Sequence, residues 1–234
     1  MFVSMRFVPR GSGTPAWPRI GALAAFLIGA ATAGLAPPAV PDARASDPVV
    51  LNEILADPAR DWDEDGAVHS RDDEWVEIAN AGAATVNLDG YRIAGADTVW
   101  RYGFTGTLAP GEVRVVYGGQ SYAWEQLRGF PQYGLRLANT GGTVNLWYLS
   151  VTDTVLVDAY TYVDHEAEDD RSSGRVPDGG FEWRLFDALN PYSGKILPSG
   201  SGCTPSPGVL FQCPVPIKTG TWGGLKTRYR TQRS

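Results

Sequence analysis

The feature that most constrains this fold is a series of short apolar segments, rich in β-branched and aromatic residues and separated by polar or glycine-containing turns. No window between residues 49 and 162 keeps a helical period. Several segments alternate apolar with polar residues, as a strand buried on one face requires. The sequence therefore predicts seven or eight strands among these segments: VVLNEIL (49–55), EWVEIAN (74–80), GYRIAG (90–95), VWRYGF (99–104), EVRVVYGG (112–119), LRLAN (135–139), TVNLWYL (143–149) and VLVDAYTY (155–162).

Strands of this length each bury one face, so two sheets must share a core. We therefore expect an all-β fold, an immunoglobulin-like antiparallel β-sandwich, over residues 46–208. The stretch SYAWEQLRGF (121–130) is the one place where a short helix between strands is expected. Residues 164–208 contain many prolines and glycines and are expected to be irregular.

The first 45 residues have the layout of a secretory signal. Three arginines precede an uncharged apolar run at 20–36, and the small residues Ala43 and Ala45 form a site of the kind that signal peptidases accept. An uncleaved membrane anchor is the alternative, because the run has about the minimum length for a membrane span. We expect cleavage after Ala45, no membrane span afterwards, and a protein that is secreted or held at the cell surface.

The charge of the chain is strongly asymmetric. Between Asp47 and the C-terminal tail, 25 acidic residues face 11 basic ones, a net charge of −14. Such a body repels nucleic acid, whose binding requires neutralisation of phosphates. The same charge attracts cations.

The C-terminal part contains the two cysteines of the chain, Cys203 and Cys213. In an exported protein this pair predicts one disulfide around a proline-rich loop. Residues 209–234 are expected to form a flexible basic tail, since five lysines and arginines gather there without an acid. A sorting or surface-attachment signal is the alternative for this tail.

Several of these segments occur in a recognisable order: VVLNEILADP (49–58), DDEWVEIANAGAATVNLDGYRI (72–93), TLAPGEVRVVYGG (107–119), LRLANTGGTVNLW (135–147), VLVDAYTY (155–162), and SSGRVPDGGFEW (172–183) with TPSPG (204–208). Together they resemble the lamin-tail domain, and the closing segments resemble those of its bacterial, exported members. The resemblance implies an immunoglobulin-like sandwich and an interaction module without known catalytic residues of its own. It does not by itself fix the function.

The stretch DWDEDGAVHSRDD (61–73) is the densest group of carboxylates in the chain. Its pattern follows the spacing of EF-hand and dockerin-type calcium loops, with Gly66 at the sharp turn. An aspartate stands where the EF-hand has its closing glutamate, and Asp73 or Glu74 are possible substitutes. Val68 is expected to pin the loop to the core. The predicted ligands of a structural calcium ion are Asp61, Asp63, Asp65, Ala67 and Asp72.

Other interpretations compete with these. The calcium stretch could be a solvated acidic turn, and the second acidic run, DHEAEDD (164–170), is expected to be a solvated loop. His69 and His165 leave a zinc site open as an alternative. We expect Trp147, Tyr148, Tyr160 and Tyr162 to form core or cross-strand pairs, whereas Trp62, Trp100, Trp124 and Trp222 are candidates for ligand contact.

These observations favour an exported, non-catalytic binding or cell-surface interaction module with a calcium-stabilised loop. Its expected partner is a protein or polysaccharide at the cell surface. The alternatives are a carbohydrate-binding or adhesive protein that uses exposed aromatic residues, and a metal-dependent hydrolase built on the carboxylates.

Overall fold

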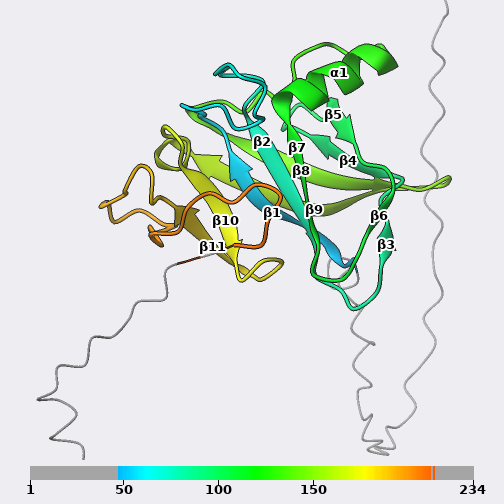
Figure 1. The fold of residues 1–234 in the computed structure, drawn as a ribbon. Helices are drawn as coiled ribbons and strands as arrows, with labels where there is room; N and C mark the ends of the chain where they lie inside the picture. Colours follow the sequence, from blue (N-terminus) through cyan, green and yellow to red (C-terminus); the bar gives the residue numbers. More distant parts are fainter. Residues whose placement is uncertain (1–46, 212, 214–234) are drawn as a thin grey trace, which may run out of the picture. The chain divides into compact units, whose positions relative to one another are not determined.

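The computed structural model describes residues 47–211 and residue 213, and these form an antiparallel β-sandwich (Figure 1). A five-stranded sheet has the order β11-β10-β1-β2-β7, and a four-stranded sheet has the order β5-β4-β8-β9. The predicted fold class is thereby confirmed. The signal and most of the basic tail, residues 1–46 and 214–234, lie outside the described residues. Within the described part, no helix is both long and apolar enough for a membrane crossing.

The strands of the five-stranded sheet come from both ends of the described chain. They are β1 (Val49–Leu55), β2 (Trp75–Asn80), β7 (Val113–Tyr117), β10 (Ser172–Val176) and β11 (Glu182–Phe186). The four-stranded sheet comes from the middle and contains β4 (Tyr91–Ala94), β5 (Trp100–Gly103), β8 (Gly141–Leu149) and β9 (Thr154–Val163). A small ribbon pairs β3 (Val86–Asn87) with β6 (Thr107–Leu108).

The expected short helix is present as α1 (Gly118–Arg128), which begins three residues earlier than its predicted start. The backbone N–H of Tyr117 donates to the side chain of Gln120 at its first turn. Gly129 ends the helix with a φ of 71°, a left-handed conformation that glycine adopts without steric cost.

The core lies between the two sheets and is built by strand alternation. Inward residues of both sheets are almost fully buried, including Leu51, Ile54, Val76, Ile78, Val116, Ile93, Val144, Leu146 and Tyr162. The segment 135–139 is not a strand, contrary to expectation, although Leu135 and Leu137 are buried in the same core. The apolar pattern of this segment reflects the burial of its two leucines and not a strand. Arg136 between them has a φ of 55°, which no strand accommodates.

The expectation that residues 164–208 are irregular is wrong, because this stretch supplies β10 and β11. Strand β10 pairs with β1 inside the five-stranded sheet. Its sequence, SSGRV, lacks an apolar pattern because its serines are buried through hydrogen bonds. Gly174 is needed there, since a Cβ atom at this position would lie 2.8 Å from the Phe186 ring.

A β-bulge in β1 brings two polar side chains to the outer face of this sheet. Leu51 lies opposite Ile78, but the next partners are Glu53 and Glu77, so Asn52 is the extra residue. The Asn52 amide donates to Glu77 at 2.7 Å, which places both side chains on the side away from the core.

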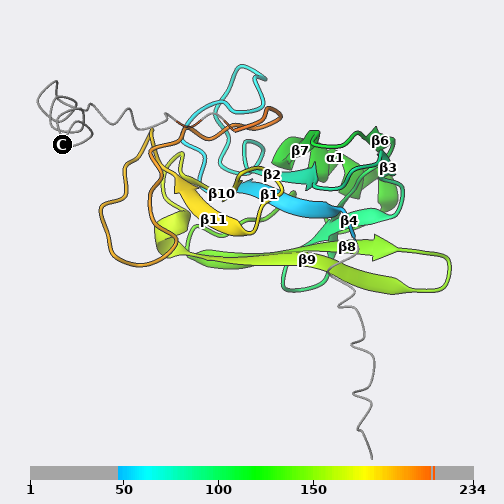
Figure 2. The ribbon, with the colours of Figure 1, turned by 90° about the horizontal axis from the view of Figure 1, so that it is seen from below.

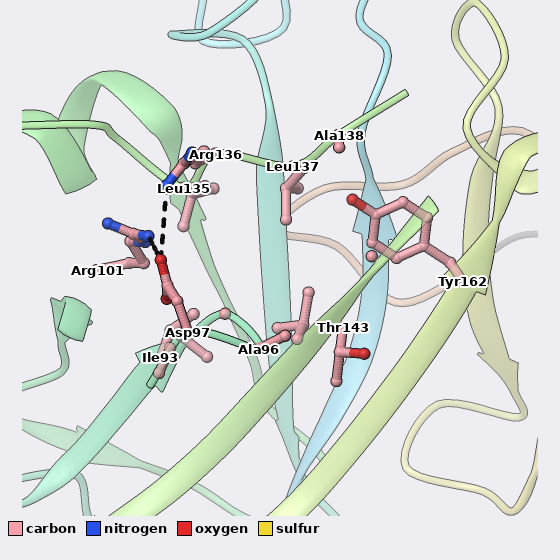
Figure 3. A pocket seen from close by; sticks show the side chains of 14 residues that line it. Ile93, Ala96, Asp97, Arg101, Leu135, Arg136, Leu137, Ala138, Thr143 and Tyr162 are labelled. Atoms are coloured by element: carbon pink, nitrogen blue, oxygen red, sulfur yellow. Dashed lines mark hydrogen bonds and ion pairs between the residues drawn. The ribbon is translucent and has the colours of Figure 1, made fainter. Parts of the chain in front are cut away.

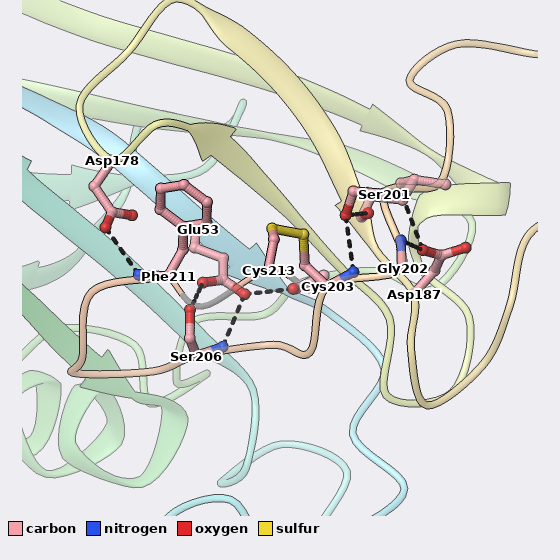
Figure 4. The surroundings of a disulfide bond; sticks show 11 residues. Glu53, Asp178, Asp187, Ser201, Gly202, Cys203, Ser206, Phe211 and Cys213 are labelled. Atoms are coloured by element: carbon pink, nitrogen blue, oxygen red, sulfur yellow. Dashed lines mark hydrogen bonds between the residues drawn. A yellow bond between two sulfur atoms is a disulfide. The ribbon is translucent and has the colours of Figure 1, made fainter. Parts of the chain in front are cut away.

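The outer face of β1 and β2 is covered by the C-terminal strap, residues 203–211 (Figure 4). The Glu53 carboxylate accepts hydrogen bonds from the Ser206 N–H at 3.2 Å, the Ser206 hydroxyl at 3.0 Å and the Ser172 hydroxyl at 2.5 Å. The Glu77 carboxylate accepts the Gly208 N–H at 2.7 Å. The strap is therefore held by buried acceptors rather than by apolar packing alone.

The predicted disulfide between Cys203 and Cys213 is present and closes this strap. Asp178, in the turn after β10, accepts the Phe211 N–H at 2.9 Å and also binds Asn52. The packed chain thus continues past Gly208, the expected domain end.

Burial raises the pKa of three glutamates in the sandwich. The pKa of Glu53 rises to about 8 and that of Glu77 to about 7, although hydrogen-bond donors around each favour the charged form. Glu74, which accepts the Leu137 N–H, has its pKa raised by burial to about 8. These glutamates therefore bind protons more tightly in the folded state than in the unfolded chain.

The substitution Glu53→Ala should lower the free energy of unfolding by about 3 kcal/mol, because it leaves buried donors of Ser206 and Ser172 without an acceptor. Chemical denaturation measures the change. Glu168→Ala, at an exposed site, is the matched control and should stay within about 0.5 kcal/mol of the parent. Equal stability of the two variants would contradict the role of Glu53.

Stability should fall as the pH rises from about 4.5 to about 8. The three glutamates have an ordinary pKa of 4.5 and folded pKa values of about 7 to 8, so the stability they provide is complete below pH 4.5 and lost through that window. Denaturation at pH 5, 6.5 and 8 measures the slope. The variant Glu53→Gln, which does not titrate, should show a shallower slope, and an unchanged slope would refute the assignment.

Candidate metal-binding loop

The candidate functional site is the acidic loop, residues 57–74, which connects β1 to β2 at one end of the sandwich. Both of its flanking strands belong to the five-stranded sheet and pair with each other, so its ends are fixed side by side. The loop contains all five predicted metal-binding residues.

Asp73 holds the loop from inside. Its buried carboxylate accepts the backbone N–H groups of Trp62 at 2.6 Å, Asp63 at 3.1 Å and His69 at 2.7 Å. Three such bonds to one carboxylate fold residues 62–69 around it. Asp73 therefore serves as the internal anchor of the loop.

Asp170, which lies far along the sequence just before β10, also holds the loop. It accepts the Ala59 N–H at 3.0 Å, the indole N–H of Trp62 at 2.8 Å and the Arg60 guanidinium at 2.9 Å. The indole of Trp62 in turn packs edge-on against Trp75 of β2, with ring centroids 6.1 Å apart. No local sequence signal predicts this anchor, because it lies more than a hundred residues from the loop.

The expectation that 164–170 is a solvated loop is therefore wrong for two of its acids. Asp170 and Glu166 are buried. Glu166 accepts the Tyr160 hydroxyl at 2.5 Å and the Ser173 hydroxyl at 2.6 Å. These carboxylates are buried because hydrogen bonds replace their hydration, which composition alone does not reveal.

Three of the predicted ligands converge. Asp61, Asp63 and Asp65 each place one carboxylate oxygen within 4.8 Å of the other two. Asp61 accepts the N–H groups of Asp65 at 3.1 Å and Gly66 at 2.9 Å, and Gly66 has a φ of 98° that allows the chain to turn there. Partial burial and the charges of neighbouring aspartates raise the pKa of Asp63, so the cluster resists full ionisation.

The other two predicted ligands lie differently. The Asp72 carboxylate pairs with the Arg71 guanidinium at 2.6 and 2.9 Å, which lowers the pKa of Asp72, and it does not join the three aspartates. Ala67 donates its N–H to Asp65 at 2.9 Å. Val68 is 55% exposed, so the prediction that it pins the loop to the core is wrong, and Trp62 packs there instead.

The cluster has the chemistry of a hard-cation site. Calcium takes six to eight oxygen ligands, and carboxylates, backbone carbonyls and water all qualify. A solvent-open cleft of about 600 Å³ adjoins the loop and is lined by Asp61, Asp63, Glu64, Tyr117 and residues of the strap. Water in this cleft has direct access to Asp61 and Asp63, and Asp65 is exposed to solvent.

A second pocket, of about 220 Å³, lies between the β4–β5 connection and residues 135–138 (Figure 3). Its acid, Asp97, pairs with Arg101 at 2.5 Å and Arg136 at 3.6 Å, so two guanidinium groups neutralise it. Tyr162 and Leu137 line the remaining wall. A carboxylate engaged in this way is a poor general base.

The two histidines do not assemble a zinc site or a catalytic dyad in the described part of the chain. Neither belongs to the group of converging metal-ligand atoms. The ring of His165 stacks on Tyr192 with centroids 4.7 Å apart, and its ring nitrogens make no hydrogen bond to any described residue.

Comparison with known protein families gives one match that bears on this site. The family model described as Lamin Tail Domain matches residues 42–164, more than half of the chain. The matched segment runs from before β1 through β9 and includes the acidic loop. It ends before β10, β11 and the strap. No curated protein matches the chain.

Replacing the internal anchor should open the loop. Asp73→Ala leaves three backbone N–H groups without an acceptor and should cost about 3 kcal/mol of stability. Limited trypsin digestion, which cleaves after Arg60 and Arg71, should then be faster than in the parent. Asp72→Ala removes only a surface ion pair and is the matched control, expected to lose under about 1 kcal/mol. Similar digestion rates for both variants would disprove the anchor role.

Proposed function

Because the chain belongs to the lamin tail domain family, we propose that it works as an exported, non-catalytic interaction module whose acidic loop holds a structural calcium ion. The convergence of Asp61, Asp63 and Asp65 is the observation that carries the calcium proposal. Membership of the family supports the non-catalytic interaction role, since the lamin tail domain is an immunoglobulin-like interaction module rather than an enzyme.

Export is supported by two independent features. The sequence of residues 1–45 has the charged start, apolar run and small-residue site of a cleaved signal. The Cys203–Cys213 disulfide belongs to a class of bond that persists mainly in oxidising compartments. An extracytoplasmic setting would also supply the millimolar calcium that a weak site requires.

In the proposed site, the three converging aspartates provide the first carboxylate ligands, and water from the adjoining cleft completes the shell. The carbonyl of Ala67 is a further candidate ligand by its position in the loop. Asp72 would join only if its carboxylate left Arg71, to which it is bound at 2.6 Å. The affinity should therefore lie in the weak range of extracellular modules, about 10⁻⁴ to 10⁻³ M.

The role of the ion would be structural. The three aspartates are like charges held close together, and a divalent cation would offset their repulsion. Asp73 and Asp170 already fix the backbone of the loop, so the ion would stiffen a preformed turn next to β2. An exposed, stiffened loop at the end of a sandwich is a suitable recognition element.

Calcium should bind the mature protein and raise its melting temperature. At a concentration a hundredfold above Kd, binding to the folded state adds about 2.7 kcal/mol of stability. Calorimetric titration measures binding, and melting in calcium and in chelator measures the stabilisation. The double variant Asp61→Asn with Asp65→Asn should lose both signals, whereas Asp89→Asn, at an exposed turn, should keep them.

A parallel titration of Asp72→Asn measures whether this side chain completes the shell. Binding weakened more than tenfold would mean that Asp72 leaves Arg71 for the ion. Binding close to that of the parent would mean that water closes the shell. No calcium binding by the parent at 10 mM would refute the metal proposal itself.

A further inference from the structure

The outer face of the four-stranded sheet carries a group of large side chains that the core does not use. Inward positions of β4 and β8, such as Ile93 and Leu146, are buried in the core. Because side chains alternate along a strand, the neighbouring Arg92 and Trp147 point to the opposite side. Figure 2 shows β8 and β9 as the outermost layer of the sandwich.

The strand register brings these outward residues together. Arg92 lies opposite Trp147 on one side and Gly103 on the other, and Trp147 lies opposite Leu156. The indoles of Trp100 and Trp147 meet edge to face, with centroids 6.2 Å apart. We call the surface formed by Arg92, Trp100, Trp147 and Leu156 the outer platform. All four side chains are only partly buried, so the platform remains accessible.

Two arginines, Arg92 in the platform and Arg128 close enough to influence its charge, lack an ion-pair partner among the described residues. Neither Arg92 nor Arg128, near the end of α1, forms an ion pair with any residue in 47–211. Burial and the charge of Arg128 lower the pKa of Arg92, while Asp89 acts in the opposite direction. Two adjacent guanidinium groups without ion-pair partners are unusual in a body with 25 acidic and 11 basic residues.

Gly103 gives Arg92 the space to lie along the sheet. A Cβ atom at Gly103 would stand 2.8 Å from three atoms of the Arg92 guanidinium. The guanidinium therefore extends over Gly103, where its Nη1 also donates to the Tyr91 carbonyl at 2.8 Å.

We propose that the outer platform binds an acidic polysaccharide, with sugar rings against Trp100 and Trp147 and carboxylates paired to Arg92 and Arg128. This inference names a partner for the interaction module and so rests on that part of the proposed function, but not on the calcium ion. Charge complementarity supports the choice, because guanidinium groups without an ion-pair partner match carboxylates on successive sugars. Indole rings offer apolar faces and edges to the C–H groups of a pyranose.

Other partners fit less well. A long nucleic acid would carry its phosphates over the acidic remainder of the protein, which repels them. A neutral polysaccharide would leave the two arginines without a role. An acidic peptide would satisfy the arginines but would not need the two partly exposed indoles beside them.

The test uses the full mature protein and oligomers of galacturonic acid, with binding followed by calorimetry in EDTA so that calcium plays no part. Oligomers of galactose, which lack the carboxylates, and oligoglutamate serve as comparison ligands. We expect binding to the galacturonate oligomers alone, weakening as salt is added. Equal binding of oligoglutamate, or no binding of the galacturonate oligomers, would overturn the proposal.

Variants then locate the site. Trp147→Ala and Arg92→Gln should each weaken binding about tenfold, which corresponds to about 1.4 kcal/mol. The matched controls are Phe181→Ala, a fully exposed aromatic residue in the β10–β11 turn, and Arg136→Gln, an exposed arginine paired with Asp97. If the control substitutions weaken binding as much as the platform substitutions, the ligand does not bind specifically at the platform and the assignment is overturned.

The variant Gly103→Ala keeps both charges and both indoles but displaces the Arg92 guanidinium, and it should weaken binding several-fold. It keeps the proposal testable if Trp147→Ala fails to fold. Thermal melting of the same variants in calcium and in chelator separates the two proposals. The platform variants should retain the calcium-dependent rise in melting temperature. The double variant Asp61→Asn with Asp65→Asn should retain galacturonate binding.

Discussion

The hydrogen bonds of the buried Glu53 side chain hold the first strand, β10 and the C-terminal strap together. This side chain lies on β1, at the start of the domain, and accepts hydrogen bonds from Ser172 on β10 and from Ser206 in the strap. In this position the carboxyl group has lost its hydration, so its hydrogen-bond partners have to replace the lost water. The bulge at Asn52 extends the same network to Glu77 and Asp178. One polar cluster therefore joins the first strand to the last described segment.

The same principle explains why the acidic loop is ordered. Asp73 and Asp170 are buried and bind backbone N–H groups and one indole, so they act as fixed acceptors for the loop. The carboxylates of Asp61, Asp63 and Asp65 remain at the surface and converge. Aspartates of the same chemistry thus have two roles. Those surrounded by protein donors are internal anchors, and those at the surface are candidate metal ligands.

The charge distribution gives the acidic loop and the outer platform different binding capacities. The acidic loop gathers negative charge that suits a divalent cation, whereas Arg92 in the outer platform and the nearby Arg128 lack an ion-pair partner in the described part of the chain. A protein of net −14 between Asp47 and the basic tail would ordinarily neutralise such arginines. The lack of an ion-pair partner for Arg92 within residues 47–211, beside Trp147, is the reason for assigning a partner to that face.

The sequence by itself determined most strands of the middle region, the helix α1 and the disulfide, because alternation, turn glycines and cysteine spacing are local signals; residues 135–139 are the exception. It placed Asp61, Asp63 and Asp65 in one loop for the same reason. Only the tertiary structure decided that SSGRV is a strand, that Asp170 supports the loop and that Trp147 faces outward. The burial of Ser172 depends on Glu53, 119 residues away, and such distant polar partners leave no periodic trace in the sequence.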